Sequence, residues 1–271
     1  MTALVLAVAL SSAGWNALSE AQRAQAHLAL PKGEVNARML AASERFLGAR
    51  YQLSPLGEGR GRDSDPLMRF DAFDCLTLVE QVMALAIAPT WEDVPQTLLR
   101  IRYDGDAVWE KRKHIMEAQW LPLNVRAGFL EDITAEVAGG TAVEERKVLG
   151  DAAWASAQGK KLALPAGAEP RGAFLLEVIR PEQAALRLRR APSGSIVVVV
   201  RADRPNSVTR VTHVGLLVQT PQGPVLRHAS KSYRRVADEP LAHFLKRNLE
   251  FAQWTVSGLS VFRAKVPGAG L

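Results

Sequence analysis

The stretch that decides the fold is DAFDCLTLVEQVMALAIAP, residues 71–89, which contains the single cysteine of the chain. Its apolar residues recur every three or four positions, namely at Leu78, Val79, Val82 and Ala86. This period predicts an amphipathic helix over residues 75–88 that buries one face. Pro89 follows and is expected to end the helix, because proline interrupts the backbone hydrogen-bond ladder.

Asp74 stands directly before this helix, where its carboxylate is expected to cap the unpaired backbone N–H groups of the first turn. Cys75 then lies in the first turn, and its spacing from Leu78 and Val79 turns the thiol toward the packed side of the helix. The positive end of the helix dipole favours a thiolate at this position. The charge of Asp74 opposes that effect, so we expect a reactive thiol to need a base nearby. The alternative is that Cys75 is a buried, unreactive small residue.

The composition indicates a folded protein with one large core. The chain has 271 residues, of which 48% are hydrophobic, and this is enough apolar material for a single domain. One cysteine excludes an intramolecular disulfide and any multi-cysteine metal site. Lys and Arg number 34 against 28 Asp and Glu, and the net charge of +6 favours polyanions in general. The basic clusters are not interleaved with aromatic residues, so we expect no specific nucleic acid partner.

Residues 1–16 resemble a secretory signal segment, because a short apolar stretch is followed by small residues, although the usual positively charged start is missing. The alternative is an ordinary N-terminal helix. No apolar run reaches the roughly 18 to 20 residues needed to cross a bilayer, so no transmembrane segment is predicted. On the signal interpretation the protein is exported.

The hydrophobic pattern changes along the chain. Residues 17–48 predict two helices, and residues 92–138 read as mostly helical. After residue 190, short β-branched runs separated by turn residues predict antiparallel strands: SIVVVVR, THVGLLVQT, GPVLRHAS and VSGLSVFRAKV. Helices that precede strands indicate an α+β fold with segregated layers.

We therefore expect one domain over residues 17–266, followed by a short tail at 267–271. Residues 139–190 have weak periodicity and a middle rich in Pro and Gly, ALPAGAEPRG, which predicts an insertion into that domain. The sequence carries no signal for the oligomeric state.

Two histidines lie on the predicted strands. His213 begins HVGLLV and His228 lies in VLRHAS, on either side of the turn TPQG. If these runs form a hairpin, both imidazoles can lie on adjacent strands and on one face of the sheet. In a Cys/His/third-residue arrangement, the first histidine takes the thiol proton and the third group orients its ring. Cys75, His213 and His228 are therefore the candidate nucleophile, base and orienting residue.

A set of motifs in this order resembles the N-acetylmuramoyl-L-alanine amidase-like branch of the NlpC/P60 superfamily of cysteine peptidases: FLGARYQL, FDAFDCLTLVEQVMAL, LRIRYDGD, KRKHIMEAQWLPLN, FLEDIT, THVGLLV and RHAS. The resemblance implies a papain-like α+β fold, in which a nucleophile helix packs on a small antiparallel sheet, with extra N-terminal helices and the insertion. It also implies hydrolysis of an amide in the bacterial cell wall, with Cys75 as nucleophile, His213 as base and His228 as the third polar residue. A periplasmic or secreted location is expected with that substrate.

The resemblance suggests roles for two residues near the nucleophile. Tyr51 of GARY aligns with a tyrosine that points into the site of this superfamily, where it can stabilise an oxyanion together with the backbone N–H of Cys75. A purely structural tyrosine is the alternative. Asp74 matches the acidic residue beside the superfamily's nucleophile, where it can face a substrate amine, or it can act as a cap alone.

The segments around LRIRYDGD resemble substrate-site segments of this branch. Arg102 can pair with a carboxylate of the murein stem peptide through its planar guanidinium, with Tyr103 beside it. The alternative is that both residues only structure a helix and turn. His114 has no second ligand at metal-binding spacing on one helix face, so no metal is predicted, and the implied reaction needs no cofactor.

The reaction that the resemblance implies is cleavage of the amide between N-acetylmuramic acid and L-alanine, by thiolate attack, an acyl-enzyme and hydrolysis. The same residues also suit an endopeptidase that cuts within the stem peptide, or acyl transfer to an acceptor other than water. A protein that binds peptidoglycan without turnover is the alternative from another class, and the intact set of Cys75, His213 and His228 opposes it. Peptidoglycan or a muropeptide is the expected partner in each case.

Overall fold

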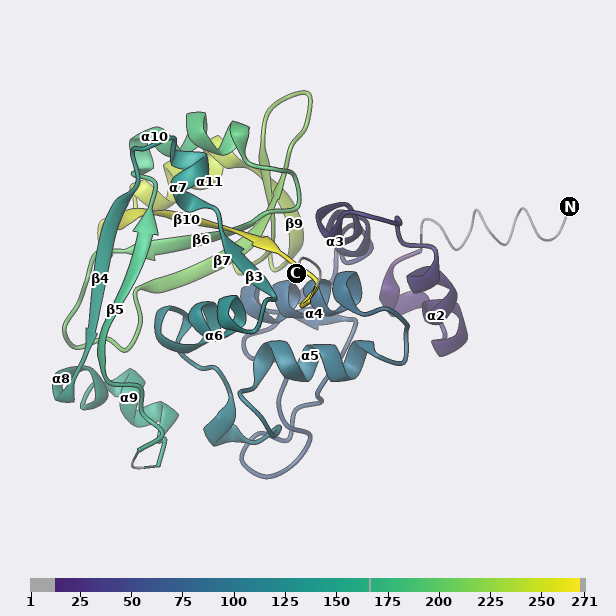
Figure 1. Ribbon diagram of the computed structural model, residues 1–271, viewed down its shortest axis with the longest axis horizontal. Helices are drawn as coiled ribbons and strands as arrows, with labels where there is room; N and C mark the ends of the chain where they lie inside the picture. The colour runs from purple at the N-terminus through teal and green to yellow at the C-terminus, as the bar shows by residue number, and fades with distance from the viewer. Residues whose placement is uncertain (1–12, 166, 269–271) are drawn as a thin grey trace, which may run out of the picture.

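The computed structural model describes residues 13–165 and 167–268, which form a layered α+β fold (Figure 1). The segment 1–16, expected to be a signal, lies for the most part outside these residues, as does most of the tail 267–271. Across the part of the chain that is described, every helix is too short or too polar to cross a membrane.

The helices predicted within residues 17–48 and at the cysteine are present as α2, α3 and α4. The α-helices are α2 (Glu20–Leu28), α3 (Val35–Glu44), α4 (Cys75–Ile87), α5 (Val94–Arg102), α6 (Leu121–Arg126), α7 (Thr134–Ala138), α8 (Asp151–Trp154), α9 (Ala157–Leu162), α10 (Pro181–Arg187) and α11 (Leu241–Leu249). Short 3-10 turns lie at Trp15–Ala17, Trp109–Lys111 and Leu188–Arg190, and a π-helical turn lies at Met116–Trp120.

The strands form one large sheet and one separate pair. They are β1 (Arg50–Tyr51), β2 (Ala72–Phe73), β3 (Leu130–Asp132), β4 (Val143–Leu149), β5 (Gly172–Val178), β6 (Ile196–Arg201), β7 (Val211–Val218), β8 (Val225–Ser230), β9 (Arg235–Pro240) and β10 (Val256–Ala264). The large sheet has the order β2-β1-β9-β8-β7-β6-β10-β3, and it is antiparallel except for the β1–β2 pair. The expectation of a small antiparallel sheet is therefore wrong, because short strands from the N-terminal half extend it at both edges.

Strand β6 explains why the large sheet is covered on both faces. All of its residues are buried, which is typical of a strand with no solvent-facing side. Ile196 and Val198 belong to the core around α4, whereas Val197 and Val199 belong to a second core with α7, α10 and α11. Figure 1 shows these helices on the side of the sheet away from α4 and α5. The expected segregation of helices into one layer is therefore only partly met.

Helix α4 is the centre of the main core. Its residues from Thr77 to Ile87 are all buried, because α3, α5, β7 and β8 surround it. The prediction of an amphipathic helix was therefore wrong about its polar side. Glu80 accepts a hydrogen bond from Nε of Arg102 at 2.7 Å, and Gln81 donates to the carbonyl of Arg69 at 2.7 Å.

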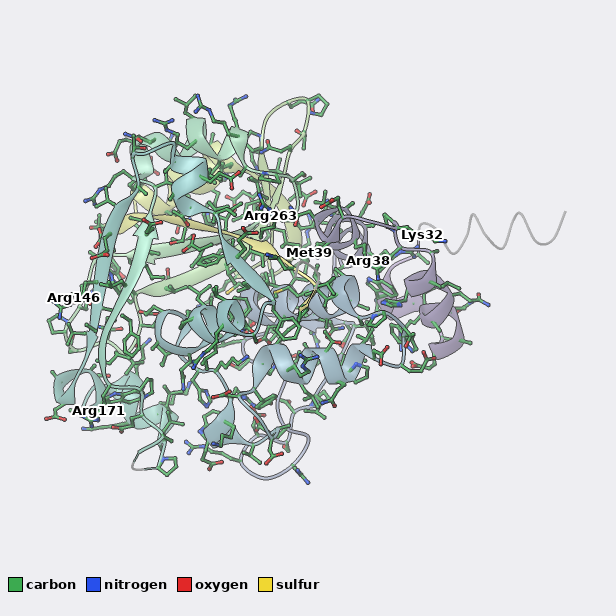
Figure 2. All side chains as sticks on the ribbon, viewed as in Figure 1. Lys32, Arg38, Met39, Arg146, Arg171 and Arg263 are labelled. Carbon is green, nitrogen blue, oxygen red and sulfur yellow. The ribbon has the colours of Figure 1, made fainter. Side chains whose placement is uncertain are left out.

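The C-terminal end of α4 is closed by a side chain from α3. Pro89 follows the cap residue Ala88, so the helix cannot continue. The guanidinium of Arg38 donates to the carbonyls of Ala86 and Ala88, which would otherwise lack partners (Figure 2). The helix that carries the cysteine is thus fixed at both ends.

Residues 139–190, the expected insertion, form the antiparallel pair β4–β5 together with α8, α9 and α10. This pair is joined to the large sheet by a bridge between Ile179 and Leu259. Figure 2 shows Arg146 and Arg171 of this unit at the edge of the molecule, and both are exposed. The insertion therefore packs against the sheet, and residues of α9 line the same pocket as the start of α4.

Candidate active site

Asp74 begins helix α4 and also fixes the loop before it. Its Oδ1 accepts from the backbone N–H of Thr77 at 2.9 Å and from the Thr77 hydroxyl at 2.8 Å. The backbone N–H of Asp74 donates to Thr77 Oγ1 at 3.0 Å, which completes a capping box. Oδ2 accepts from the N–H of Ser54 at 2.9 Å, and Ser54 has a φ of +48°, near the left-handed region that disfavours side chains. Both carboxylate oxygens are thus used within the protein.

Cys75 lies at the start of α4, partly exposed, with Tyr51 of β1 beside it. Burial, with a smaller contribution from the charge of Asp74, raises the pKa of the thiol to about 12. The backbone N–H groups of Val214, Leu76 and Cys75 itself, which point at the sulfur, oppose that rise. The effect of burial on the thiol pKa is thus larger than that of the helix N-terminus, and the resting thiol is protonated. The expected need for a base is consistent with this result.

The two histidines lie on neighbouring strands, β7 and β8, which form the predicted hairpin. Nε2 of His213 is 2.7 Å from Nδ1 of His228, and the two rings meet edge to face. Phe244 of α11 packs on both, with its ring centroid 5.5 Å from each. Both imidazoles therefore share the face of the sheet that α11 covers.

The thiol contacts β7 at its backbone. The sulfur lies at the N–H of Val214, the residue after His213. Nε2 of His213 faces His228, so Nδ1, the ring nitrogen nearer the backbone, is the one that His228 does not contact. Within residues 13–165 and 167–268, no hydrogen bond joins the thiol to this ring. The structure thus brings the two histidines together on the face under α11, whereas Cys75 packs with the core around α4 and meets β7 at its backbone. Because catalytic hydrogen bonds often tighten only when substrate is bound, the pairing of the thiol with His213 stays a prediction.

Both histidines are neutral near pH 7. Burial lowers the pKa of His213 well below 6.5, and the neighbouring His228 ring and the charge of Arg247 add to that effect. Burial also lowers the pKa of His228 to about 4, although the nearby Glu239 carboxylate raises it. A neutral imidazole can accept a proton, so His213 has the charge state that a base requires.

A buried carboxylate lies on the far side of His228 from His213. Glu239 on β9 is fully buried, and its Oε2 lies 3.1 Å from Nε2 of His228, although outside the ideal N–H direction. The sequence did not predict β9, because RVADEP has no clear alternation and ends in proline. Glu239 was therefore missed, and no local sequence signal distinguishes it from a surface glutamate.

A cleft of about 340 Å³ opens beside the start of α4. Asp74, Arg102 and Lys113 line it, together with His114 and, from the insertion, Lys161. Basic groups outnumber acidic ones in this wall. The cleft therefore suits a ligand that carries a negative charge.

Arg102 lies in the wall of this cleft, whereas Tyr103 lies outside it. Arg102 is 3% exposed and donates from Nη1 to the carbonyl of Leu67 at 3.0 Å and from Nε to Glu80, while Nη2 has no protein partner among the described residues. Arg102 lines the cleft. Tyr103 is also buried, but its hydroxyl donates to Glu58 at 2.9 Å and secures the loop before β2. The structure thus gives Tyr103 a packing role away from the cleft wall.

Helix α9 of the insertion closes the far side of the cleft. Lys161 and Leu162 line the wall. Arg62 donates to the carbonyl of Lys161 at 3.1 Å, and Trp109 Nε1 donates to the carbonyl of Leu162 at 2.9 Å. The insertion is thus part of the site's wall, which its weak sequence pattern did not indicate.

His114 is engaged within the protein. Its Nε2 lies 2.7 Å from the carbonyl oxygen of Trp109, and burial lowers its pKa to about 4. In the described part of the chain, no group of three or more His, Cys, Asp or Glu side chains is placed to hold a metal ion.

Solved structures of other proteins resemble this fold. A Legionella pneumophila protein described by the family model DUF1460 has a TM-score of 0.78 and 21% sequence identity, and the match covers 91% of this chain and 94% of that one. An N-acetylmuramoyl-L-alanine amidase from Bacteroides uniformis has a TM-score of 0.66 and 24% identity over 86% of this chain and 100% of that one. Among curated proteins no sequence match was found.

A family model supplies the sequence relationship. The model described as AmiA-like, N-acetylmuramoyl-L-alanine amidase-like, matches residues 41–251. This range includes Tyr51, Cys75, both paired histidines and Glu239. Because the match spans most of the sequence, the chain belongs to the AmiA-like family of N-acetylmuramoyl-L-alanine amidase-like proteins.

Proposed function

We propose that this protein is a cysteine-dependent peptidoglycan amidase of the papain-like NlpC/P60 type, which cleaves the amide between N-acetylmuramic acid and L-alanine. The observation that carries the proposal is a thiol at a helix N-terminus whose sulfur lies at the backbone N–H of Val214, the residue after His213, together with the 2.7 Å contact between His213 and His228. Membership of an amidase-like family supports the substrate class. With that substrate, the protein works in the bacterial envelope, in the periplasm or after secretion.

The first half of the reaction forms an acyl-enzyme. The sulfur of Cys75 attacks the carbonyl carbon of the lactyl group, and its proton moves to Nδ1 of His213 as the S–C bond forms. The carbonyl electron pair moves onto oxygen, where the N–H of Cys75 and the hydroxyl of Tyr51 stabilise the charge. One such donor contributes about 2.7 to 4 kcal/mol to transition-state stabilisation in other enzymes. When the C=O bond re-forms, the C–N bond breaks and the amine of L-alanine leaves with the proton from His213.

The second half releases the acid. Water attacks the thioester carbonyl and gives one proton to His213, while the C–S bond breaks and the muramic acid carboxyl is formed. The proton on His213 then returns to the sulfur of Cys75. His228 holds the ring of His213 throughout, so the same nitrogen accepts the proton in each half. The three backbone N–H groups at the sulfur stabilise the thiolate when it appears.

The cleft at the start of α4 holds the stem peptide in this proposal. The free Nη2 of Arg102 is a buried donor without a protein partner among the described residues, and a stem carboxylate would satisfy it. Asp74 acts as the helix cap, because its oxygens are occupied by Thr77 and Ser54. Tyr103 supports the loop and does not touch substrate.

Product analysis on a defined muropeptide tests the proposal. Mass spectrometry should find an intact stem peptide with a free L-alanine amine and a sugar with a free lactyl carboxyl. A shortened stem that remains on the sugar would instead identify an endopeptidase. The variants C75A and C75S should lose at least about 10³-fold in rate while their thermal unfolding stays close to that of the wild type. Activity within tenfold of wild type would refute the thiol mechanism.

The same assay tests the role of Arg102. Muropeptides with a free stem carboxylate are compared with the same compounds converted to the amide. We expect KM to rise about tenfold or more for the amide, because a charge-assisted hydrogen bond is lost. This substrate-side test avoids breaking the buried pair of Arg102 with Glu80, which would destabilise the fold. Equal KM values would show that Arg102 is structural.

A further inference from the structure

Glu239 is the end of a polar row that crosses three neighbouring strands. Ala237, two residues before Glu239 on β9, pairs with His228 of β8. The side chains of Glu239 and His228 are therefore diagonal neighbours on the same face of the sheet. The next step along the row is the 2.7 Å contact between His228 and His213 of β7. The row therefore runs from a fully buried carboxylate to the strand beside which the Cys75 sulfur lies.

Helix α11 holds this carboxylate in place. Arg247 donates to both of its oxygens, from Nη2 to Oε2 at 2.8 Å and from Nε to Oε1 at 3.2 Å. Nδ1 of His243 lies 2.8 Å from Oε1. Although burial acts in the opposite direction, the hydrogen bonds and charge of Arg247 lower the pKa of Glu239 overall. Glu239 is therefore ionised at pH 7 and can only accept hydrogen bonds.

An acceptor at this position fixes where the protons of both histidines lie. Within the described residues, no other acceptor lies within reach of Nε2 of His228. A carboxylate 3.1 Å away favours a proton on that nitrogen, which leaves the lone pair of neutral His228 on Nδ1. The facing Nε2 of His213 must then be the donor across 2.7 Å. The lone pair of His213 is left on Nδ1, the nitrogen nearer the backbone of β7.

We propose that Glu239 is a positioning residue: held by Arg247 and His243, it sets the tautomer of His228 and through it that of His213. The basic nitrogen of His213 is thereby Nδ1, on the side of the ring nearer the strand backbone that the Cys75 sulfur contacts at Val214. Without the carboxylate, the two rings can exchange the direction of their hydrogen bond. His213 would then present an N–H to the thiol, which cannot take its proton.

The tautomers are measured directly, without any substrate. Protein labelled with ¹⁵N-histidine is examined by NMR at pH 7, and the signals are assigned with H213N and H228N variants. We expect both His213 and His228 to carry their proton on Nε2. A wild-type His213 protonated on Nδ1 would overturn the proposal, whatever the behaviour of any variant.

The variant E239Q tests the consequence for reactivity, and D238N is its matched control. Asp238 is the adjacent acid on β9 and forms a bidentate pair with Arg227, at 2.7 and 2.8 Å, so its replacement removes the same charge without touching Glu239. Iodoacetamide labels the single cysteine, so its rate reports on Cys75 alone. At pH 7 we expect E239Q to slow alkylation about tenfold and to lower kcat about 10²-fold, with KM changed less than threefold. D238N should stay within threefold of wild type in all three values.

The kcat measurement rests on the proposed function, whereas the tautomer and alkylation measurements do not. The experiments therefore distinguish a failure of this inference from a failure of the proposed function. If wild-type protein does not hydrolyse muropeptides, the proposed function fails, but the tautomers and the alkylation rates still decide the role of Glu239. If E239Q is folded and matches D238N in alkylation rate and tautomer, Glu239 contributes to stability alone and the inference is wrong. If E239Q does not fold, the wild-type tautomer decides.

Discussion

Acidification should lower the free energy of unfolding of this protein, because the buried His228 takes up a proton at higher pH in the unfolded chain than in the folded protein. His228 is 1% exposed, and it faces His213 and the Glu239–Arg247 pair. Burial lowers its pKa from 6.5 to about 4. The unfolded chain takes up a proton at this ring near pH 6.5, whereas the folded protein stays neutral there down to about pH 4. The contribution to the free energy of unfolding is therefore complete above pH 6.5 and is lost as the pH falls toward 4.

The size of the stability loss follows from the difference between the pKa values of His228 in the unfolded and folded protein. A proton bound by the unfolded chain alone gives a slope of about 1.4 kcal/mol per pH unit. The full loss from His228 is then about 3 kcal/mol, and about 2 kcal/mol of it falls between pH 7 and pH 5. This is a large share of the roughly 5 to 15 kcal/mol by which domains are stable. His27 and His114, whose pKa values burial also lowers, add further loss.

Replacing His228 with asparagine isolates its share. H228N keeps a polar group that donates and accepts but does not titrate. Urea unfolding of both proteins at pH 7, 6 and 5, followed by circular dichroism, gives the free energies. We expect the wild type to lose about 2 kcal/mol more than H228N over this range, because His27 and His114 contribute equally to both. Parallel curves would refute the argument that burial keeps His228 neutral.

Three further predictions follow from the site. In single-turnover assays, H213A should cost more than H228A, and H228N or H228Q should recover part of the H228A loss, since an orienting group can be replaced but a base cannot; equal losses without rescue would exclude the orienting role. D74A should lower the free energy of urea unfolding by about 1 to 2 kcal/mol, whereas D74N retains a cap and loses less, and both should move the pH profile of Cys75 alkylation to lower pH because the opposing charge is gone. Binding to anionic wall preparations should weaken as salt rises, because exposed charges are screened over about 8 to 10 Å, and salt-independent binding would indicate a specific pocket.

The features that the sequence predicted are those that local chemistry determines. The helix at Cys75, its cap at Asp74 and the stop at Pro89 depend on neighbouring residues alone. The hairpin that brings His213 and His228 together depends on two alternating runs and the turn between them. Each of these signals spans a few residues, so no knowledge of distant packing was needed.

The errors concern groups whose partners are distant in the sequence. Glu80 and Gln81 look like the solvent side of an amphipathic helix, but Glu80 binds Arg102 and Gln81 donates to the carbonyl of Arg69. A period shows which residues are polar, and it does not show whether another element covers them. The size of the sheet was underestimated for the same reason, because strands of two or three residues carry almost no alternation.

On the proposed function, the chemistry and the specificity of this fold come from different elements. The row from Glu239 to His213 lies on adjacent strands under α11, where main-chain ladders and ring packing hold each group. The cleft wall has a different origin, because α9 comes from the insertion and is tied to the domain through backbone carbonyls that accept from Arg62 and Trp109. Changes in the side chains of α9, such as Lys161, can therefore alter what the cleft binds without moving the histidines. A sequence comparison limited to the cysteine and the two histidines would describe the reaction and leave the substrate undetermined.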